Sequence, residues 1–579
     1  MARFYPHIKK HMTIIIKSYS ILFLFFFFSC DSNNHLSNRL NVVWLVAEDL
    51  GPYIPSFGDS TIETPNLSRL AREGVCYNNV YSVSGVCSPS RASIVTGMYP
   101  TSIGAHHMRT ISQQPAAREK GIIDYEVVPP PQVKMVSQIL RENRYYCTNN
   151  KKEDYQFYKS ILAWDESSVF AHWRNRPKDS KFFSIFNFGV THESNLWDPW
   201  YRQFDLDPFP PDRSKEKWWE AFIGVNKTLY TPEDINLRIP PYLPDNNFVR
   251  KDLMLMYSNI IEMDQKVGLI LDQLEEDGLL DKTIIVFYTD HGGPLPRQKR
   301  LLYDSGIRVP MIIRYPNKVR SGETDDRLIS FVDFAPTLLS MVGINPPDYY
   351  QGIAFEGKFR TNNTREYIHA SADRFDEHYD LIRAVRDKRY KYLKNYYPER
   401  PYYLPLEYRE RMNTMKELLR MREEGVLNDI QAQWFRTSKP EEELFDTYND
   451  PHELYNLADD VSFEKKLIEL RAECNRWVND VDDKGFIAET ELIEIFWPGK
   501  KQPTTEEPKI TVKEGKLHVT CDTKGAGIGY KYSDRDKDPW TGWRIYDKPI
   551  ELEDVQEIEL RTHRIGFLPS KIKRFKNES

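Results

Sequence analysis

Two runs of consecutive apolar residues constrain the fold of this 579-residue chain more than any other feature. Residues 41–47 and 283–289 are rich in β-branched and aromatic side chains and contain no charged residue. Such runs are typical of strands that are covered on both faces in an α/β sheet. Each ends abruptly in polar residues, which are Glu48 and Asp49 after the first run and Asp290 and His291 after the second. Because ligands collect at the carboxyl ends of strands in open α/β sheets, we expect the two strand ends to form one site.

The segments around these runs extend the α/β pattern. Between residues 250 and 277, apolar side chains recur every three or four positions, which predicts a long amphipathic helix. Residues 182–188 are apolar and predict a further strand. Residues 308–314 continue the α/β pattern, and residues 328–343 predict an amphipathic helix. We therefore expect a main α/β domain over residues 38–345.

Beyond residue 345 the pattern becomes mixed. Residues 390–394 predict a strand, whereas residues 407–424 and 463–480 predict helices. A smaller α+β subdomain is therefore expected over residues 346–497.

The last part of the chain follows a linker at residues 498–508, which contains three prolines and a glycine. Short strand-like runs separated by turns then predict a small β module over residues 509–579. Residues 521–530, 543–546 and 561–567 resemble the β-sandwich that ends chitobiase and β-hexosaminidase chains. Its aromatic residues suit either contact with a glycan or packing against the main body.

Composition excludes several classes of protein. With 40% hydrophobic and 28% charged residues, the chain is neither an integral membrane protein nor disordered, and its length predicts roughly two to four domains. A formal net charge of −6 argues against a nucleic-acid partner, although a local basic pocket can still hold an anion.

The N-terminus predicts export. Four basic residues precede an apolar run at residues 21–28, which is too short to span a bilayer but fits the core of an export signal. Ser29 and Cys30 end the segment in a way that resembles a bacterial lipobox. We therefore expect residues 1–30 to be a signal peptide, Cys30 to carry a lipid anchor, and the protein to be periplasmic or a lipoprotein of the outer membrane or cell surface.

The most specific stretch surrounds Cys87. Ser88 and Pro89 suit the first turn of a helix, so free backbone N–H groups and the positive end of the helix dipole would face the thiol. Arg91 lies one helical turn further on, on the same side. A cysteine in this setting is either a nucleophile of low pKa or the centre of an anion pocket.

Residues 87–97 also match the pattern C-x-P-S-R-x-x-x-x-T-G, by which the chain resembles the sulfatase family. Other matching segments are residues 64–74, Lys299 with Arg308 at their nine-residue spacing, residues 333–339 and residues 444–457. The altered second signature of the family at residues 151–154, together with His106, His107 and residues 191–193, places the resemblance nearest to the heparan-sulfamidase-like branch. The resemblance covers roughly residues 40–480. It implies the α/β fold of the alkaline-phosphatase superfamily, in which helices flank a mixed sheet.

The resemblance also implies a mechanism. In the family, a maturation enzyme oxidises the cysteine, here Cys87, to formylglycine (3-oxoalanine), whose hydrate offers one hydroxyl to attack sulfur and another to expel sulfate. A divalent cation, expected to be Ca²⁺ with Mg²⁺ or Mn²⁺ as alternatives, lowers the pKa of the nucleophile and polarises the sulfate. The implied ligands are Glu48, Asp49, Asp290, His291 and Cys87. Glu48 and His291 depart from the family's usual aspartate and asparagine.

Further residues are assigned by the same resemblance. The implied catalytic residues around Cys87 are Arg91, Lys152, His192 and Lys299, with His192 near the leaving-group oxygen. Asp154 stands where the family's G-K-x-H signature has histidine, so its role is either catalysis or substrate contact. Further candidate substrate contacts are His106, His107, Arg308 and Arg374, since arginine and histidine suit anionic sugars. For His106, His107 and Arg374, structural polar pairing in loops is the equal alternative.

The expected function is hydrolysis of sulfate esters on a sulfated polysaccharide, such as ulvan or a glycosaminoglycan, or on its oligosaccharides. Two alternatives remain open. Residues 290–292 also resemble the Asp-His-Gly motif of phosphonate monoester hydrolases, which favours a phosphonate or phosphodiester substrate. From another class, the chain would be a glycan-binding lipoprotein with an inactive site.

Overall fold

The computed structural model describes residues 39–108, 110, 119, 123–197, 235–533, 542–553 and 557–577. The predicted signal peptide, residues 1–30, and the predicted lipid anchor at Cys30 lie outside the described residues. Within the described residues, no helix combines the length and the apolar character needed to cross a membrane.

An eight-stranded sheet forms the centre of the main domain, with strand order β4-β3-β5-β1-β6-β7-β2-β8. The strands are β1 (Asn41–Ala47), β2 (Val75–Tyr81), β3 (Tyr146–Asn150), β4 (Glu166–Ser167), β5 (Phe182–Phe188), β6 (Thr283–Thr289), β7 (Arg308–Arg314) and β8 (Glu323–Ser330). β1 pairs in parallel with β5 and β6, whereas β7 is antiparallel to β6 and β2, so the sheet is mixed. The α/β fold class, with a mixed sheet flanked by helices, is confirmed.

The register of β1 brings three strand ends to one edge. Ala47 is aligned with Thr289 of β6 and with Phe188 of β5. The polar residues that follow each strand therefore emerge side by side, as expected from the two apolar runs.

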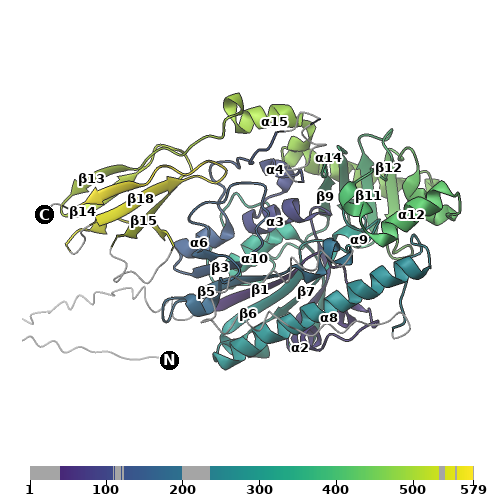
Figure 1. The fold of residues 1–579 in the computed structure, drawn as a ribbon, viewed down its shortest axis with the longest axis horizontal. Coiled ribbons are helices and arrows are strands. Elements are labelled where there is room, and N and C mark those ends of the chain that lie inside the picture. The colour runs from purple at the N-terminus through teal and green to yellow at the C-terminus, as the bar shows by residue number, and fades with distance from the viewer. Residues whose placement is uncertain are drawn as a thin grey trace, which may run out of the picture. The chain divides into compact units, whose positions relative to one another are not determined.

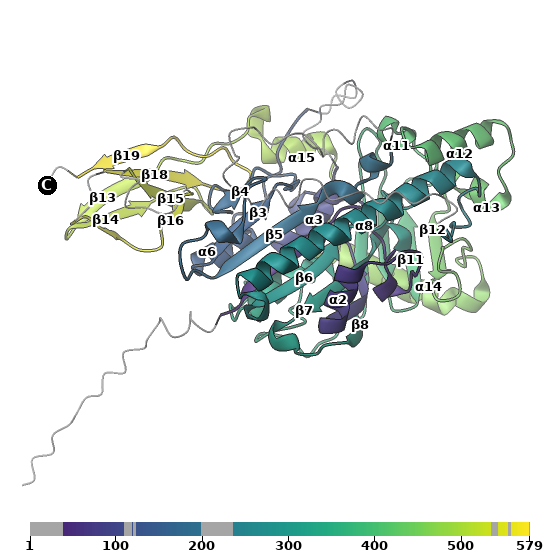
Figure 2. The same ribbon diagram turned by 60° about the horizontal axis from the view of Figure 1, so that its bottom comes forward.

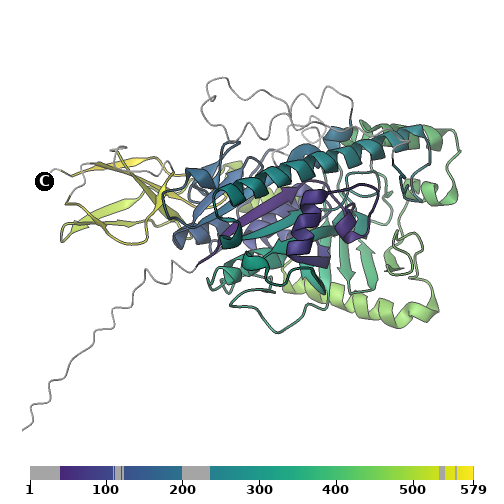
Figure 3. The same ribbon diagram turned by 90° about the horizontal axis from the view of Figure 1, so that it is seen from below.

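Helices cover both faces of the sheet (Figures 1 and 2). The long α8 (Asn247–Glu276) and α2 (Pro65–Glu73) lie over one face, as the view from below also shows (Figure 3). α3 (Cys87–Thr96), α6 (Val136–Glu142) and α10 (Phe334–Met341) cover the other face. Alternate residues of β1 belong to the two resulting cores: Val43 and Leu45 pack with α8, and Val42 and Trp44 with α3 and α10. This explains why the whole strand is apolar.

Two predicted helices have different boundaries in the structure. In the segment 328–343, the first three residues complete β8, and a capping box between Ser330 and Asp333 begins a new helical segment. The segment 407–424 is divided into α11 (Glu407–Glu410) and α12 (Asn413–Glu423), because the buried Met412 has an extended backbone. The helical periodicity alone did not show either break.

The C-terminal subdomain contains an antiparallel sheet of order β12-β11-β10-β9. Its strands are β9 (Ile368–Ala372), β10 (Ile382–Arg386), β11 (Tyr390–Asn395) and β12 (Glu442–Asp446). α14 (Glu464–Asp480) packs on this sheet through Leu467, Leu470 and Cys474. The predicted strand at 390–394 and helix at 463–480 are therefore present.

The last module consists of two small antiparallel sheets with a core of their own. Their strands are β13 (Lys509–Lys513), β14 (Lys516–Thr520), β15 (Gly527–Tyr532), β16 (Arg544–Ile545), β17 (Ile550–Glu551), β18 (Glu557–His563) and β19 (Lys573–Lys576). Arg141 of the main domain donates to the Trp543 carbonyl at 2.6 Å, and the Gly566 amide donates to the Tyr158 carbonyl at 2.8 Å. The module thus packs against the main body.

We expect the stability of the central sheet to depend strongly on Trp44. Its ring lies edge-on to the rings of Phe183, Tyr288 and Phe334 at centroid distances of 5.0, 5.5 and 6.2 Å. Trp44→Ala should lower the free energy of unfolding by about 3–5 kcal/mol, because it leaves a cavity in the core. Urea unfolding followed by circular dichroism measures this loss. The matched control is Phe248→Ala, since Phe248 is 54% exposed, and equal effects of the two variants would contradict the expectation.

Candidate active site

Asp49 stands at the end of β1 and joins several parts of the site. Its side chain is buried, and its backbone φ of 50° is a left-handed conformation that costs a non-glycine residue about 1–2 kcal/mol. Asp49 Oδ2 accepts hydrogen bonds from Lys299 Nζ and from the Glu193 amide, both at 2.7 Å. Asp49 Oδ1 lies 2.9 Å from His291 Nε2. Burial opposes its ionisation, but the charges of Lys299, His192 and His291 hold the pKa of Asp49 well below its usual value.

The second strand end is tied to the first through Asp290. Its Oδ1 accepts a hydrogen bond from the Asp49 amide at 3.1 Å, and its Oδ2 accepts one from Arg91 Nε at 3.0 Å. Burial opposes ionisation, but the Arg91 guanidinium lowers the pKa of Asp290 to about 2. Asp290 is therefore a carboxylate near neutral pH although it is fully buried.

Cys87 is the first residue of α3, as the sequence predicts, with Val86 as an extended N-cap. Its Sγ lies 3.4 Å from His291 Nε2 and 3.9 Å from Asp49 Oδ1. Burial by itself raises the pKa of the thiol, but the charges of Lys299 and Lys152 outweigh it, so the pKa lies below the ordinary value. The helix start thus faces both strand ends.

The donor set of the two strand ends suits a divalent cation. Asp49, Cys87, Asp290 and His291 each offer a ligand atom, and these atoms lie within 4.8 Å of one another. Burial disfavours a charged imidazole, yet the two carboxylates raise the pKa of His291 to about 10, so the site attracts positive charge strongly. Carboxylate oxygens are the ligands that Ca²⁺ and Mg²⁺ prefer. The residues present therefore fit the implied metal.

Glu48 is placed differently from the other predicted ligands. Its Oε2 accepts a hydrogen bond from Lys152 Nζ at 2.8 Å, and its Oε1 lies 3.8 Å from Arg91 Nη2. It forms a separate cluster of ligand atoms with Cys87 and His192. Glu48 thus adjoins Cys87 while its carboxylate is engaged by two cations.

A cavity of about 230 Å³ opens in front of Cys87. It is lined by Val86, Cys87, Met108, Lys152, Asp154, His192, Lys299, Arg300, Asp376 and Tyr408. Four of the predicted site residues around Cys87 therefore meet in one space: Lys152, Asp154, His192 and Lys299. Lys299 Nζ lies 3.3 Å from His192 Nε2, and Asp154 accepts a hydrogen bond from Ser88 Oγ.

Four predicted substrate contacts do not line this cavity. Arg308 donates to the Asn78 carbonyl and lines a separate cavity of about 330 Å³. Arg374 is completely buried and makes two hydrogen bonds of 2.7 Å to Glu489, while His107 accepts a hydrogen bond from the Arg374 amide. His106 is buried beside His107, with the two ring centroids 4.2 Å apart. Arg374 and His107 are thus engaged in the structural pairing that the sequence left as an alternative, whereas His106 makes a ring contact with His107 and has no hydrogen-bond partner among the described residues at either ring nitrogen.

Comparison with known proteins identifies the family. The family model for sulfatases matches residues 40–344, and the model for the C-terminal region of N-sulphoglucosamine sulphohydrolase matches residues 297–433. The chain belongs to the sulfatase family. It is a sulfuric ester hydrolase, and the resemblance to the sulfamidase-like branch is confirmed.

Two curated relatives of this sulfatase span most of its length. An ulvan-active sulfatase of Formosa agariphila is 52% identical over 546 residues, which cover 93% of this chain and 91% of the relative. The N-sulphoglucosamine sulphohydrolase of Homo sapiens is 25% identical over 501 residues, which cover 81% of this chain and 95% of the human enzyme.

Solved structures share the fold at lower identity. A protein in complex with its substrate D-glucosamine-2-N,6-O-disulfate matches with a TM-score of 0.54 at 19% identity, covering 78% of this chain and 100% of that one. A phosphonate monoester hydrolase of Agrobacterium radiobacter matches with a TM-score of 0.52 at 15% identity, covering 77% and 97%. These likenesses concern the fold alone.

The sequence assigned no role to several residues that lie around the cavity at Cys87. Glu193 is buried between two cations: its carboxylate lies 3.1 Å from Lys299 Nζ and accepts two hydrogen bonds from Arg300, at 2.8 and 3.0 Å. Glu193 directly follows the predicted residue His192, and Arg300 directly follows the predicted residue Lys299. This adjacency was the available signal in the sequence. Asp376 and Tyr408 come from the C-terminal region, and no local pattern marks them.

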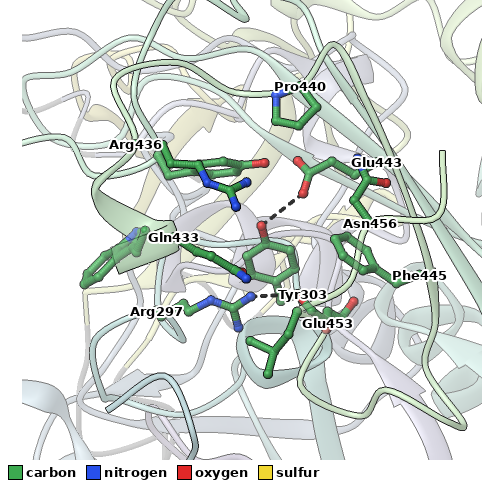
Figure 4. A pocket seen from close by; sticks show the side chains of 12 residues that line it. Arg297, Tyr303, Gln433, Arg436, Pro440, Glu443, Phe445, Glu453 and Asn456 are labelled. Atoms are coloured by element: carbon green, nitrogen blue, oxygen red, sulfur yellow. Dashed lines mark hydrogen bonds between the residues drawn. The ribbon is translucent and has the colours of Figure 1, made fainter. Parts of the chain in front are cut away.

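A third, much smaller pocket lies beside β12 (Figure 4). Its volume of about 30 Å³ is roughly that of one water molecule. Arg297 donates to the Glu453 carbonyl at 2.7 Å, and Tyr303 donates to Glu443 at 3.2 Å. This pocket has no room for a sugar, so of these two the cavity at Cys87 is the better candidate for catalysis.

Because Glu193 is buried between two cations, we expect its replacement to lower the free energy of unfolding strongly. Glu193→Gln removes the charge that two buried cations share, and breaking a buried ion pair costs about 3–5 kcal/mol. The matched control is Glu276→Gln, because Glu276 pairs with Arg174 at the surface and is 68% exposed, where such a pair contributes less than about 1 kcal/mol. Urea unfolding of both variants tests the difference. A Glu193→Gln protein as stable as the control would contradict it.

Proposed function

We propose that this sulfatase hydrolyses sulfate esters of a sulfated polysaccharide or its oligosaccharides, with ulvan as the substrate class best supported. The observation that carries the proposal is the position of Cys87, 3.4 Å from His291 and 3.9 Å from Asp49, in a cavity lined by Lys152 and Lys299. The relative that is 52% identical along most of the chain is an ulvan-active sulfatase, which favours that polysaccharide.

The proposed nucleophile is formylglycine, produced from Cys87 by a separate maturation enzyme. Its hydrate would supply one hydroxyl for attack on sulfur and a second for the release of sulfate. Asp49 Oδ1 lies close enough to the γ position of residue 87 to accept a hydrogen bond from a hydroxyl group there, and His291 Nε2 lies within contact distance of the same position. These two side chains can therefore orient the nucleophile.

Three cations are proposed to hold the sulfate group and its developing charge. Lys152 and Lys299 line the cavity, and Arg91 lies behind Cys87, where it fixes Asp290 and Asn187. Preorganised positive charge in a buried site stabilises a transition state strongly because it needs no reorganisation. For both lysines, carboxylate partners outweigh the cost of burial and raise the pKa, so both remain charged.

His192 is the proposed general acid. Its Nε2 faces Lys299, and its Nδ1 is 2.8 Å from Ser194 Oγ, which fixes the orientation of the ring. A histidine so placed can donate a proton to the leaving sugar oxygen. Asp154 is proposed as a substrate contact.

Asp49, Asp290 and His291 are the proposed metal ligands, with residue 87 and Glu48 beside them. When bound, a divalent cation, expected to be Ca²⁺, would lower the pKa of the nucleophile and polarise the sulfate. The buried carboxylates of the chain supply the negative charge that such an ion requires.

The second candidate activity is phosphonate or phosphodiester hydrolysis. The sequence Asp290-His291-Gly292 favours this activity. The chain also shares its fold with a solved phosphonate monoester hydrolase. Comparing the release of sulfate from an aryl sulfate with that of phosphate products from an aryl phosphodiester separates the two activities. Export and lipidation at Cys30 remain predictions from the sequence.

Replacing Cys87 tests the proposed nucleophile. Cys87→Ala should lower kcat/KM for sulfated ulvan oligosaccharides by about 10⁴-fold or more, since the attacking group is lost. In the wild-type protein made together with the maturation enzyme, mass spectrometry of the peptide that contains residue 87 should show an aldehyde in place of the thiol. Full activity of Cys87→Ala would reject the mechanism.

Replacing Asp290 tests the proposed metal site. Asp290→Asn should weaken Ca²⁺ binding by about 100-fold or more, because even indirect supports of metal ligands contribute 10–100-fold. Isothermal titration of the chelator-treated protein measures the affinity. Asp326→Asn, at an exposed residue that accepts from Asn78, is the control and should bind Ca²⁺ as wild type. Equal affinities of the two variants would remove Asp290 from the ligand set.

A further inference from the structure

Two carboxylates line the same cavity as Cys87 but come from distant parts of the chain. Asp154 follows β3, and its carboxylate lies 3.7 Å from Lys152 Nζ. Asp376 follows β9, and its carboxylate accepts a hydrogen bond of 3.4 Å from Arg300. The side chain of Asp154 is 32% exposed, whereas that of Asp376 is 1% exposed. A bound sugar would therefore meet negative groups from two segments.

The cations of the cavity are already compensated by carboxylates. Lys152 is paired with Glu48 as well as with Asp154, and Arg300 is held by Glu193 as well as by Asp376. Lys299 lies 2.7 Å from Asp49 and 3.1 Å from Glu193. These pairings leave little uncompensated positive charge in the lining for a second anionic group of the substrate.

Tyr408 and Met108 complete the lining with a ring and an apolar side chain. The Tyr408 ring lies 6.3 Å from the His192 ring and 5.9 Å below the Arg300 guanidinium, so its position is fixed on two sides. An aromatic ring offers a rigid apolar surface to the C–H face of a sugar. The lining thus combines an apolar wall with hydrogen-bond acceptors.

We propose that Asp154 and Asp376 are specificity-determining residues that accept hydrogen bonds from free hydroxyl groups of the sulfated ring. The preferred ring is then a neutral sugar with one sulfate. A uronic acid or a second sulfate on the same ring is repelled by the two carboxylates. This inference rests on the proposed sulfatase function and deepens it by naming the class of ring at the cleavage site.

The experiment compares pairs of methyl pyranoside monosulfates that differ only at C6, which bears either a hydroxymethyl group or a carboxylate. One pair is made for each ring position of the sulfate, and sulfate release gives kcat/KM. For the pair that is cleaved best, we expect the neutral sugar to exceed the uronate by about 10-fold or more, because sites that satisfy hydroxyl groups reject analogues strongly. Equal values for the two sugars would overturn the proposal.

Charge-removing variants assign this preference to the two residues. Asp154→Asn and Asp376→Asn keep an acceptor oxygen but remove the charge, so each should reduce the ratio of neutral to uronate kcat/KM by about 5-fold or more. Asp59→Asn removes a carboxylate from the separate cavity beside Tyr257 and should leave the ratio unchanged. An unchanged ratio in both cavity variants, with melting temperatures near that of wild type, would overturn the assignment.

Binding measurements keep this inference separable from the sulfatase function. Isothermal titration of Cys87→Ala with each pair of sugars should show the same preference for the neutral ring without turnover. Equal binding of both sugars would overturn the specificity proposal even if sulfate release is normal. Absence of sulfate release from every sugar and from an aryl sulfate, together with a preference in binding, would overturn the proposed function alone.

Discussion

The buried contact between Asp49, Lys299 and His291 is the interaction on which the rest of the site depends. Two carboxylates, Asp49 and Asp290, stand side by side at adjacent strand ends, where their mutual repulsion would be severe in a buried setting. Lys299 pairs with Asp49 and Arg91 pairs with Asp290, so both carboxylates stay ionised in the buried setting. The segment that carries Lys299 must therefore pass close to this edge of the sheet. Lys299 and Arg300 of the same segment line the cavity at Cys87.

Much of this arrangement could be predicted from the sequence because its signals are local. An uninterrupted apolar run ending in acids marks β1 and β6, and Ser88 with Pro89 marks the helix that begins at Cys87. The partner of Arg374 could not be predicted from local sequence. Arginine suits an anionic sugar, yet Glu489, 115 residues further on, occupies its guanidinium. The contributions of Asp376 and Tyr408 depend on packing between distant segments, and no periodicity or motif reports such packing.

The inner part of the site and the outer lining of its cavity are built from different kinds of segment. The proposed nucleophile and metal ligands, Cys87, Asp49, Asp290 and His291, stand at a helix start and at the ends of buried strands, where neighbouring layers hold them rigidly. The outer lining instead comes from connecting segments, such as the one that carries Asp376 between β9 and β10. Loops tolerate substitution better than buried strands do. A family with this division can keep one chemistry and change the sugar that it recognises, in keeping with relatives whose named substrates differ while the fold is shared.

The alignment of Ala47 with Thr289 and Phe188 also limits how such a protein can diverge. One residue gained or lost within β1 would shift everything after it by about 3.3 Å and turn each side chain to the opposite face. Asp49 would then miss both Lys299 and the neighbouring strand end. Insertions are thus confined to the loops, because the seven-residue length of β1 sets where Asp49 lies relative to the acid of the neighbouring strand end. The proposed metal site depends on that spacing.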